Sequence, residues 1–155
     1  MPLSFQIMDI YEFRELPFQS AGYLKTLQLR DEVLRKPLGM GFTSEQLSTE
    51  KSDWHLALFD QDLCVACCVL TPVDQQRVKL RQMAVLSEFR GKKLGSRLLQ
   101  QAESFALSKG FSGMVLHARA YAIPFYEKAG YQTRGGEFTE VGLPHFLMEK
   151  VVSGS

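Results

Sequence analysis

The sequence has almost no net charge, since 18 Lys and Arg residues face 17 Asp and Glu residues, for a formal charge of +1. A nucleic-acid surface usually shows as a clear basic excess, so we expect no nucleic-acid partner and only local anion sites. No apolar run approaches the roughly 20 residues that span a bilayer. The first residues, "MPLSFQIMDIYEF", lack the basic and apolar segments of a signal peptide. We therefore expect a cytoplasmic protein without a membrane partner.

Cysteine is scarce, and the three that occur are Cys64, Cys67 and Cys68. Cys64 and Cys67 form a C-x-x-C, a spacing found in redox and zinc sites. The surrounding segment, "LCVACCVL", has the pattern of a buried strand, and residues three apart on a strand point to opposite faces. On this argument the two thiols cannot share a metal. We interpret all three cysteines as small core residues and expect no metal.

The 155 residues suffice for one domain with a substantial core, and no repeat or linker divides them, so we predict a single domain over 1–155. Hairpin patterns come first and strand–helix–strand units follow. This order predicts a mixed α/β fold, with one mixed, mostly antiparallel sheet flanked by helices. Predicted strands cover 5–10, 54–60, 63–73, 77–86, 113–118, 131–135 and 145–152, and predicted helices cover 20–35, 43–52, 94–109 and 120–130.

Two predicted helices carry an apolar face. In the helix over 20–35, we place Leu24, Leu27 and either Val33 or Leu34 near that face. The helix that ends at Gly110 has a longer apolar stripe. Its members are Leu94, Leu98, Leu99, Ala102, Phe105 and Ala106. These stripes predict which sides of the two helices pack on the sheet.

The fourth predicted strand has an irregular alternation. Val78 and Leu80 are apolar on even positions, whereas Met83 and Val85 place the larger apolar groups on odd positions. A one-residue slip near Gln82 explains this change, and a β-bulge, which often lies beside an active site, produces such a slip. A regular strand stays open as the alternative, because the later even positions are apolar too.

A basic turn with two glycines lies between that strand and the next helix. Gly91 and Gly95 stand four apart, with Arg90, Lys92 and Lys93 around them. The start of a helix offers unpaired N–H groups and a partial positive charge to an anion, and glycine lets a ligand approach the backbone. The spacing fits neither the Walker loop nor the G-x-G-x-x-G fingerprint. These residues alone leave open both a phosphate site and an ordinary capped turn with solvated lysines.

The segment "LRQMAVLSEFRGKKLGSRLLQQAE" resembles motif A of the GNAT superfamily of acyl-CoA-dependent N-acetyltransferases, whose phosphate loop reads Arg/Gln-x-x-Gly-x-Gly/Ala. Arg90 takes the first place of this loop, Lys93 stands in place of its first glycine, and Gly95 takes the last place. A second segment, "IPFYEKAGYQTRG", resembles the family's Ala-x-x-Phe-Tyr-x-x-x-Gly-Phe signature. The resemblance covers about 78–150. The segments "LRDEVLRKPLG" and "EFTEVGLPHFLMEK" are further similar to the bacterial ElaA-like members.

The resemblance implies a GNAT-like fold with two central strands splayed apart, here 81–86 and 113–118, and a bulge in the first of them. It also implies acetyl-CoA as cosubstrate, with its pyrophosphate on the backbone N–H groups of 90–96 and its pantetheine arm on the strand 81–86. Arg119 stands where many members have asparagine, and both a coenzyme contact and a surface position stay open for it. The expected coenzyme-binding residues are Met83, Ala84, Val85, Arg90, Gly91, Lys92, Lys93, Leu94, Gly95, Ser96, Arg119 and Tyr126.

Acetyl transfer needs a free amine, a stabilised oxyanion and a proton for the leaving thiolate. The resemblance makes Tyr126 the candidate acid, whereas spacing alone favours a packed helix aromatic. A backbone N–H of Met83 or Val85 is the candidate for the oxyanion. For the base we favour His145 with Glu137, and a half-buried structural role for the histidine is the alternative.

Three further residues are assigned lesser roles. Glu140 is the less favoured carboxylate, because the sequence does not place it relative to the cleft. His117 lies in an apolar strand and is interpreted as a core residue. His55, next to Trp54, is expected to be structural or to line the acceptor cleft.

The sequence therefore predicts an N-acetyltransferase that moves an acetyl group from acetyl-CoA to a primary amine by direct attack in a ternary complex. A small-molecule acceptor is slightly favoured, because the chain is compact and has no long acidic docking stretch. A non-catalytic acyl-CoA-binding or sensing module and a protein-modifying acetyltransferase are the alternatives. The sequence specifies neither the acceptor nor the acyl chain, and a homodimer is one of the oligomeric states that it leaves open.

Overall fold

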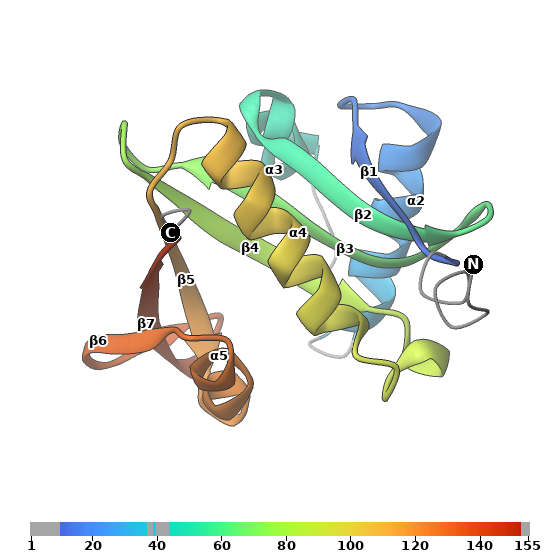
Figure 1. The fold of residues 1–155 in the computed structure, drawn as a ribbon. Helices are drawn as coiled ribbons and strands as arrows, with labels where there is room; N and C mark the ends of the chain where they lie inside the picture. The colour runs from blue at the N-terminus through green and yellow to red at the C-terminus, as the bar shows by residue number, and fades with distance from the viewer. Residues whose placement is uncertain (1–9, 37–38, 40–43, 153–155) are drawn as a thin grey trace, which may run out of the picture. The chain divides into compact units, whose positions relative to one another are not determined.

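The structure is a computed structural model that describes residues 10–36, 39 and 44–152. Seven described strands are joined in the order β1-β2-β3-β4-β5-β7-β6 (Figure 1). They are β1 Glu12–Leu16, β2 Trp54–Asp60, β3 Leu63–Pro72, β4 Arg77–Val85, β5 Gly113–Arg119, β6 Gln132–Glu140 and β7 Leu143–Val151. The described α-helices are α2 Ala21–Arg30, α3 Ser44–Ser48, α4 Leu94–Ser108 and α5 Ile123–Lys128.

The strand pairing confirms the predicted fold class. The pairs β1–β2, β2–β3, β5–β7 and β6–β7 are antiparallel, and β4–β5 is parallel. The β4–β5 ladder joins 77–80 to 113–116, although both strands continue beyond it. The sheet is therefore mixed and mostly antiparallel, and the short parallel ladder agrees with the expected splay.

Residue contacts divide the chain into two compact units, which are described separately. The N-terminal unit comprises 1–70 and 82–101, and the C-terminal unit comprises 71–81 and 102–155. Strand β4 and helix α4 each contribute to both units. The single domain over 1–155 stays a prediction. Among the described residues, none of the helices combines the length and apolar character that crossing a membrane requires.

Helix α2 starts where the sequence predicts, but it buries a different face. The Ser20 hydroxyl caps the helix by accepting a hydrogen bond from the Tyr23 N–H at 3.2 Å. The buried residues are Tyr23, Thr26, Leu29 and Arg30, whereas Leu24 is 53% exposed. The predicted placement of Leu24 in the core was therefore wrong. Polar Thr26 and charged Arg30 belong to the buried face, so the spacing of the apolar residues alone did not identify that face.

The helix continues from α2 as a π-helical turn over Asp31–Arg35. The wider turn changes the angular spacing of successive side chains. Both Val33 and Leu34 pack against one core cluster as a result, where the sequence had left a choice between them. The buried members of this cluster come from β1, α2, β2, β3 and β4: Leu16, Leu29, Ala57, Phe59, Cys64, Cys67 and Ala84.

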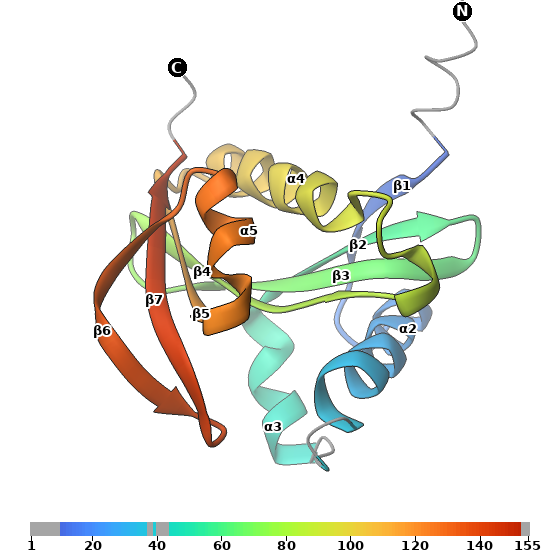
Figure 2. The same cartoon turned by 90° about the horizontal axis from the view of Figure 1, so that it is seen from below.

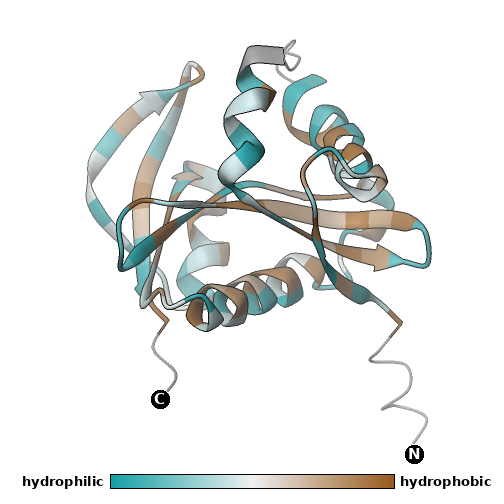
Figure 3. Cartoon of the chain, turned by 90° about the horizontal axis from the view of Figure 1, so that it is seen from above, coloured by the Kyte–Doolittle hydropathy of each residue, from teal (hydrophilic) through white to brown (hydrophobic). Residues whose placement is uncertain are grey.

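The cysteines are buried and unpaired, as predicted, but the argument from opposite faces was wrong. Phe59 pairs with Cys64 while Leu58 pairs with Ala66, so Val65 is an extra residue in β3. This bulge brings Cys64 and Cys67 into the same cluster. The hydrogen bond between them lowers the pKa of the Cys64 thiol and raises the pKa of the Cys67 thiol. Figure 3 shows the apolar colour of the central strands of the sheet.

Strand β1 was missed by the sequence analysis. Its sequence is EFREL, and it pairs with β2 from Glu12 opposite Phe59 to Leu16 opposite His55. Only Leu16 is buried, because the strand lies at an edge of the sheet. Three charged residues hid the strand pattern. The strand predicted at 5–10 lies outside the described residues except for its last position, which is a bend.

Helix α4 confirms the predicted apolar stripe. Leu94, Leu98, Leu99, Ala102 and Ala106 are buried, and Phe105 is half-buried. The helix is followed by Gly110 with φ 93°, a backbone conformation that glycine adopts without a steric penalty. Figure 3 shows apolar and polar colours side by side along this helix.

The C-terminal unit contains α5 and the β6–β7 hairpin next to β5 (Figure 2). The segment 136–144 was predicted as a connection, but β6 continues to Glu140 and β7 begins at Leu143. The turn is only Val141 and Gly142, both with positive φ. The pairing of β6 shifts between Arg134 and Phe138, where two glycines interrupt the strand pattern. That interruption explains why the strand was read as a loop.

Candidate active site

The phosphate-loop candidate lies in the N-terminal unit, between β4 and α4. A 3-10 turn over Ser87–Phe89 follows the strand, and Arg90 is extended. The residues from Arg90 to Lys93 are exposed. The Lys93 carbonyl accepts a hydrogen bond from the Arg97 N–H at 3.1 Å, so the ladder of α4 starts at this residue. The N–H groups of the first helical turn have no intrahelical acceptor and are suited to an anion.

Two residues of this loop have a left-handed backbone. Gly91 has φ 84° and Lys93 has φ 61°. Lys93 stands where the GNAT pattern has its first glycine, and a positive φ is the conformation that glycine adopts most easily. Position 93 therefore has a backbone conformation that suits the glycine of the pattern, although the residue there is lysine.

Aromatic and basic side chains connect the loop to residues before β1. The Arg97 guanidinium donates to the Tyr11 carbonyl at 3.4 Å and lies 5.8 Å from the centre of the Tyr11 ring. Tyr11 in turn makes an edge contact with Phe89, and the Lys92 ammonium lies 5.9 Å from the Phe89 ring. These contacts restrict the start of α4 and the turn before it.

Strand β4 has an irregular backbone at the predicted position. Gln82 has φ 56° inside the strand, a conformation that regular strands exclude. Its side-chain carbonyl accepts a hydrogen bond from Arg30 Nε at 3.4 Å. Met83 and Val85 are half-buried, and Ala84 is buried in the core cluster. The coenzyme contacts assigned to these three residues stay a prediction.

Tyr126 and Arg119 belong to the C-terminal unit. Tyr126 is 8% exposed and makes edge contacts with the rings of Phe125 and Tyr131, at 5.0 and 5.8 Å between ring centres. Arg119 ends β5, is half-buried and lies opposite His145 in the strand register. The geometry holds the Tyr126 ring in place, and the catalytic role of its hydroxyl stays a prediction.

His145 forms part of a cluster in the same unit that we call the His–Glu–His cluster, made of His117, Glu140 and His145. Glu140 Oε1 lies 3.0 Å from His117 Nδ1, and Glu140 Oε2 lies 3.6 Å from His145 Nε2. The Phe138 ring contacts both imidazoles, edge-on to His117 and stacked on His145. His145 Nδ1 donates to the Leu143 carbonyl at 2.9 Å. One carboxylate therefore bridges two histidines.

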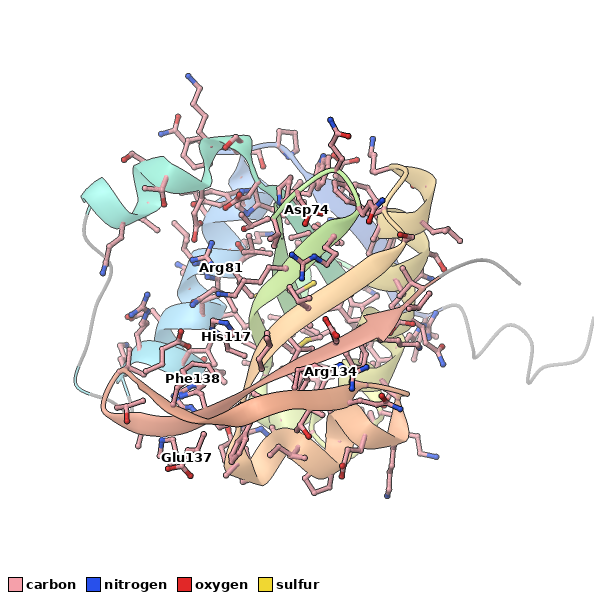
Figure 4. All side chains as sticks on the ribbon, turned by 90° about the vertical axis from the view of Figure 1, so that its left-hand side faces the viewer. Asp74, Arg81, His117, Arg134, Glu137 and Phe138 are labelled. Atoms are coloured by element: carbon pink, nitrogen blue, oxygen red, sulfur yellow. The ribbon has the colours of Figure 1, made fainter. Side chains whose placement is uncertain are left out.

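The carboxylate at His145 is Glu140, not Glu137. Glu137 is exposed and makes no hydrogen bond or ion pair with the described residues. Figure 4 shows Glu137 on the opposite side of the β6 ribbon from Phe138, which lies on the side of His117. Alternation along the strand places Glu140 on the Phe138 side as well. The core position expected for His117 was wrong, since its side chain is 27% exposed and hydrogen-bonded to Glu140.

Charges around Glu140 favour its ionised form. Burial alone would raise the pKa of Glu140, but the hydrogen bond from His117 and the charges of His117, His145 and Lys79 outweigh it and lower this pKa. Burial lowers the pKa of Lys79, and Glu140 opposes that shift. An ionised Glu140 can only accept hydrogen bonds, which fixes the donor in its contact with His117.

His55 makes buried contacts within the N-terminal unit. His55 is 2% exposed, and its Nε2 donates to the Glu50 carbonyl at 2.9 Å. Its ring contacts Tyr23 at 4.7 Å between centres, which fits the structural role expected as one alternative. Within the described part of the chain, no three His, Cys, Asp or Glu residues are grouped as a metal site would need.

One of the relatives in sequence carries an acetyltransferase name. The chain is 30% identical over 123 residues to the uncharacterized N-acetyltransferase YjcF of Bacillus subtilis, covering 79% of this chain and 87% of that protein. It is 37% identical over 75 residues to the uncharacterized protein YyaT of the same species, covering 48% of this chain. The match spans 51% of the length of YyaT.

Solved structures share the fold. A Lactobacillus plantarum protein provisionally assigned as an N-acetyltransferase superposes with a TM-score of 0.83 at 23% identity, over 94% of this chain and 100% of that one. Escherichia coli ElaA gives a TM-score of 0.74 at 23% identity, over 90% and 99% of the two chains. An aminoglycoside 6'-N-acetyltransferase complexed with coenzyme A gives 0.77 at 19% identity, over 93% and 98%.

The family assignment rests on a match to a sequence profile. The sequence profile of the Acetyltransferase (GNAT) family matches residues 9–131, which is most of the chain and includes both the phosphate loop and the Tyr126 segment. The first resembling segment lies wholly within this match, and the second lies within it up to Tyr131. The chain is a member of the GNAT family of acetyltransferases.

Proposed function

We propose that this protein transfers an acetyl group from acetyl-CoA to a primary amine by direct attack in a ternary complex. The observation that carries the proposal is the loop before α4, where Gly91 and Lys93 take left-handed conformations at the family's phosphate-loop position. Such a turn aims several N–H groups at one point in front of the helix. One of the solved structures that share this chain's fold is complexed with coenzyme A, which supports the choice of cosubstrate.

In this proposal, the N–H groups of 90–96 hold the pyrophosphate of acetyl-CoA, and Arg90, Lys92 and Lys93 add positive charge. Met83, Ala84 and Val85 bind the pantetheine arm through backbone groups. A backbone N–H of Met83 or Val85 stabilises the oxyanion. Arg119 and Tyr126 complete the proposed coenzyme contacts.

The proposed chemistry needs one acid and one base. Tyr126 is the acid that gives a proton to the leaving thiolate, because it matches the tyrosine of the family's second signature. The sequence favours His145 with Glu137 as the base. The contacts of the His–Glu–His cluster support Glu140 as the carboxylate that orients an imidazole. This cluster is a suitable source of the base, since an imidazole exchanges protons near neutral pH.

The proposed acceptor is a small molecule, which rests on the sequence alone. The competing function is a non-catalytic acyl-CoA-binding module, and thiol release with a panel of amines separates the two. A protein acceptor, a homodimer and the cytoplasmic location also stay at the level of sequence-based expectations.

The test of the coenzyme site is the pair Gly95→Asp and Gly95→Asn. Both variants add a side chain of nearly the same shape, but only Gly95→Asp brings a carboxylate to the pyrophosphate. A carboxylate in the first turn of a helix is favourable for the free protein, so lost binding cannot be ascribed to a weaker helix. Calorimetry with acetyl-CoA should show a much greater loss of affinity for Gly95→Asp. Equal affinity of Gly95→Asp and wild type, with the fold intact by circular dichroism, would exclude the site.

A further inference from the structure

The His–Glu–His cluster contains two imidazoles, and their hydrogen bonds make them chemically different. We infer that His117, oriented by Glu140, is the general base of the proposed acetyl transfer, and that His145 positions Glu140. This inference rests on the proposed function, because it assigns the proton acceptor of that reaction.

The tautomer of His117 follows from its partner. An ionised carboxylate has no proton to donate, so the 3.0 Å contact requires that Nδ1 of His117 carries the hydrogen and Glu140 Oε1 accepts it. In the neutral ring, Nε2 then keeps its lone pair. A base needs such a nitrogen, and the carboxylate behind Nδ1 stabilises the imidazolium that forms when Nε2 takes a proton.

The nitrogens of His145 are oriented differently. Its Nδ1 faces the Leu143 carbonyl, which is also only an acceptor, so this nitrogen carries a hydrogen. Its Nε2 faces Glu140 Oε2 at 3.6 Å. A lone pair there would point at a carboxylate, whereas a proton there would make an ion pair. Neither state directs a free lone pair of His145 to a substrate.

The two histidines also differ in how much of each side chain is exposed. The His117 side chain is 27% exposed and that of His145 is 6% exposed. An incoming amine can therefore reach His117 more easily. Phe138 packs edge-on against His117 with 4.9 Å between ring centres, which limits rotation of the imidazole while leaving part of it accessible.

The strand register explains how these residues meet. His117 on β5 lies opposite Leu147 on β7, and His145 on β7 lies opposite Phe138 on β6. Phe138 and Glu140 are two apart on one strand and share a face. Glu140 therefore reaches across β7 to His117 and passes His145 on the way.

Other charged or titratable groups near His117 come from β4, β6, β7 and β5 itself. Strand β4 contributes Lys79, which interacts electrostatically with both Glu140 and Arg81. Strand β6 contributes Glu140, strand β7 contributes His145, and β5 itself ends in Arg119. Glu140 is the negative group in hydrogen-bond contact with the His117 ring, so its removal is the change expected to affect proton transfer most.

The proposed step balances as follows. The amine nitrogen attacks the thioester carbonyl carbon and a C–N bond forms, while Nε2 of His117 takes a proton from that nitrogen. The C–S bond breaks and its electron pair stays on sulfur, which receives the proton of the Tyr126 hydroxyl. Solvent then takes the proton from His117 and returns one to Tyr126. The products are the N-acetylated amine and coenzyme A.

The experiment compares His117→Gln, His145→Gln and Glu140→Gln with wild type, using a panel of amines that contains an aminoglycoside, a linear diamine and a peptide with a free N-terminus. For wild type, kcat/KM of an accepted amine should rise with pH as the base loses its proton. His117→Gln should remove that rise and lower kcat by about 10²–10⁴-fold. His145→Gln should keep the rise. Glu140→Gln should lower kcat/KM, because the imidazolium that forms during proton transfer loses its carboxylate partner.

Two controls make the result specific. Glu149→Gln removes a carboxylate of β7 that pairs with Arg134, and it should leave the pH profile unchanged. Acetyl-CoA affinity by calorimetry should be unchanged in all variants of the cluster. Glu137→Gln is a further comparison, and its loss of kcat/KM should be smaller than that of Glu140→Gln.

A readout without turnover tests the same geometry. Long-range ¹H–¹⁵N spectra of the three histidines should show neutral His117 with its hydrogen on Nδ1, assigned by loss of the signal in His117→Gln. A hydrogen on Nε2 of neutral His117 would overturn the inference, as would a pH rise that survives His117→Gln and disappears in His145→Gln. If wild type acetylates none of the amines, the proposed function fails together with this role, and that outcome is recognisable because the wild type itself is inactive.

Discussion

Arg30 on α2 and Glu50 in the 3-10 turn after α3 form a buried, two-pronged ion pair. Arg30 Nη1 donates to Glu50 Oε1 at 2.9 Å, and Nη2 donates to Oε2 at 2.5 Å. The two residues are 1% and 3% exposed. The Tyr23 hydroxyl adds a third hydrogen bond to Glu50 at 2.8 Å, and Arg30 also reaches Gln82. The pair thus connects two helical segments to the irregular residue of β4.

Removing one member of this pair should destabilise the N-terminal unit strongly. Glu50→Gln leaves the Arg30 charge buried without its counter-ion, and breaking a buried pair in this way costs about 3–5 kcal/mol. The measurement is the free energy of unfolding from urea titration. The double variant Arg30→Met, Glu50→Leu removes both charges and should recover most of the loss. A Glu50→Gln variant as stable as wild type would show that the pair contributes little.

The same pair predicts how stability depends on pH. Burial alone would raise the pKa of Glu50, but the hydrogen bonds and charge of Arg30, together with the bond from Tyr23, outweigh it and lower this pKa. A depressed carboxyl pKa stabilises the fold above the unfolded value of about 4.3, and this stabilisation is lost as the pH falls through the folded pKa.

Wild type should therefore lose stability on acidification more steeply than Glu50→Gln, which has no carboxyl group to protonate at this position. The difference between the two unfolding free energies, followed from neutral pH to about pH 3, isolates Glu50 from the other carboxylates with lowered pKa values. A difference that stays constant over this range would contradict the prediction.

Replacing Lys93 by glycine should cost less stability than replacing it by a β-branched residue. A residue other than glycine at positive φ pays about 1–2 kcal/mol, and glycine avoids this cost but loses about 0.4–1 kcal/mol through the unfolded chain. Lys93→Gly should then be neutral or more stable by up to about 1.6 kcal/mol. Lys93→Val should be less stable, because a β-branched side chain is least compatible with φ 61°. Thermal unfolding without acetyl-CoA measures both, and a Lys93→Val variant more stable than Lys93→Gly would contradict the assignment of a left-handed residue.

The elements with regular periodicity could be predicted from the sequence. Strand β2 has the predicted bounds, and the stripe of α4 from Leu94 to Ala106 is buried or half-buried throughout. In both cases successive residues follow one geometric period, so pattern and structure coincide. The loop before α4 was found because its glycines and the family pattern agree.

The errors lie where the backbone departs from a regular period. The bulge at Val65 reverses the face of Cys64, and the π-helical turn after Arg30 brings both Val33 and Leu34 to the core. A sequence pattern assumes a constant spacing, so it misassigns residues beyond such an irregularity. A buried charge such as Arg30 also defeats the pattern, because its partner Glu50 is distant in the sequence.

The partner of His145 was missed for a related reason. Glu137 and Glu140 differ by three residues and so point to opposite faces of β6, a distinction that required recognising the segment as a strand. His117 had a usable signal, because Leu116 and Ala118 are buried while His117 and Arg119 alternate with them. Alternation on β5 would have placed His117 on the more polar face.

The last prediction concerns the hydroxyl of Tyr126. Its ring is packed against Phe125 and Tyr131, so Tyr126→Phe should keep these contacts and the stability of α5. If the hydroxyl protonates the leaving thiolate, its loss should lower kcat by about 10²–10⁴-fold while acetyl-CoA affinity is nearly unchanged. Thiol release under conditions where chemistry limits the rate measures kcat, and calorimetry measures affinity. Tyr131→Phe is the matched control, because it removes a phenol that donates to Glu103 at 2.8 Å in the same unit. Wild-type kcat in Tyr126→Phe would restrict this residue to packing and would require another proton donor, such as solvent, for the thiolate.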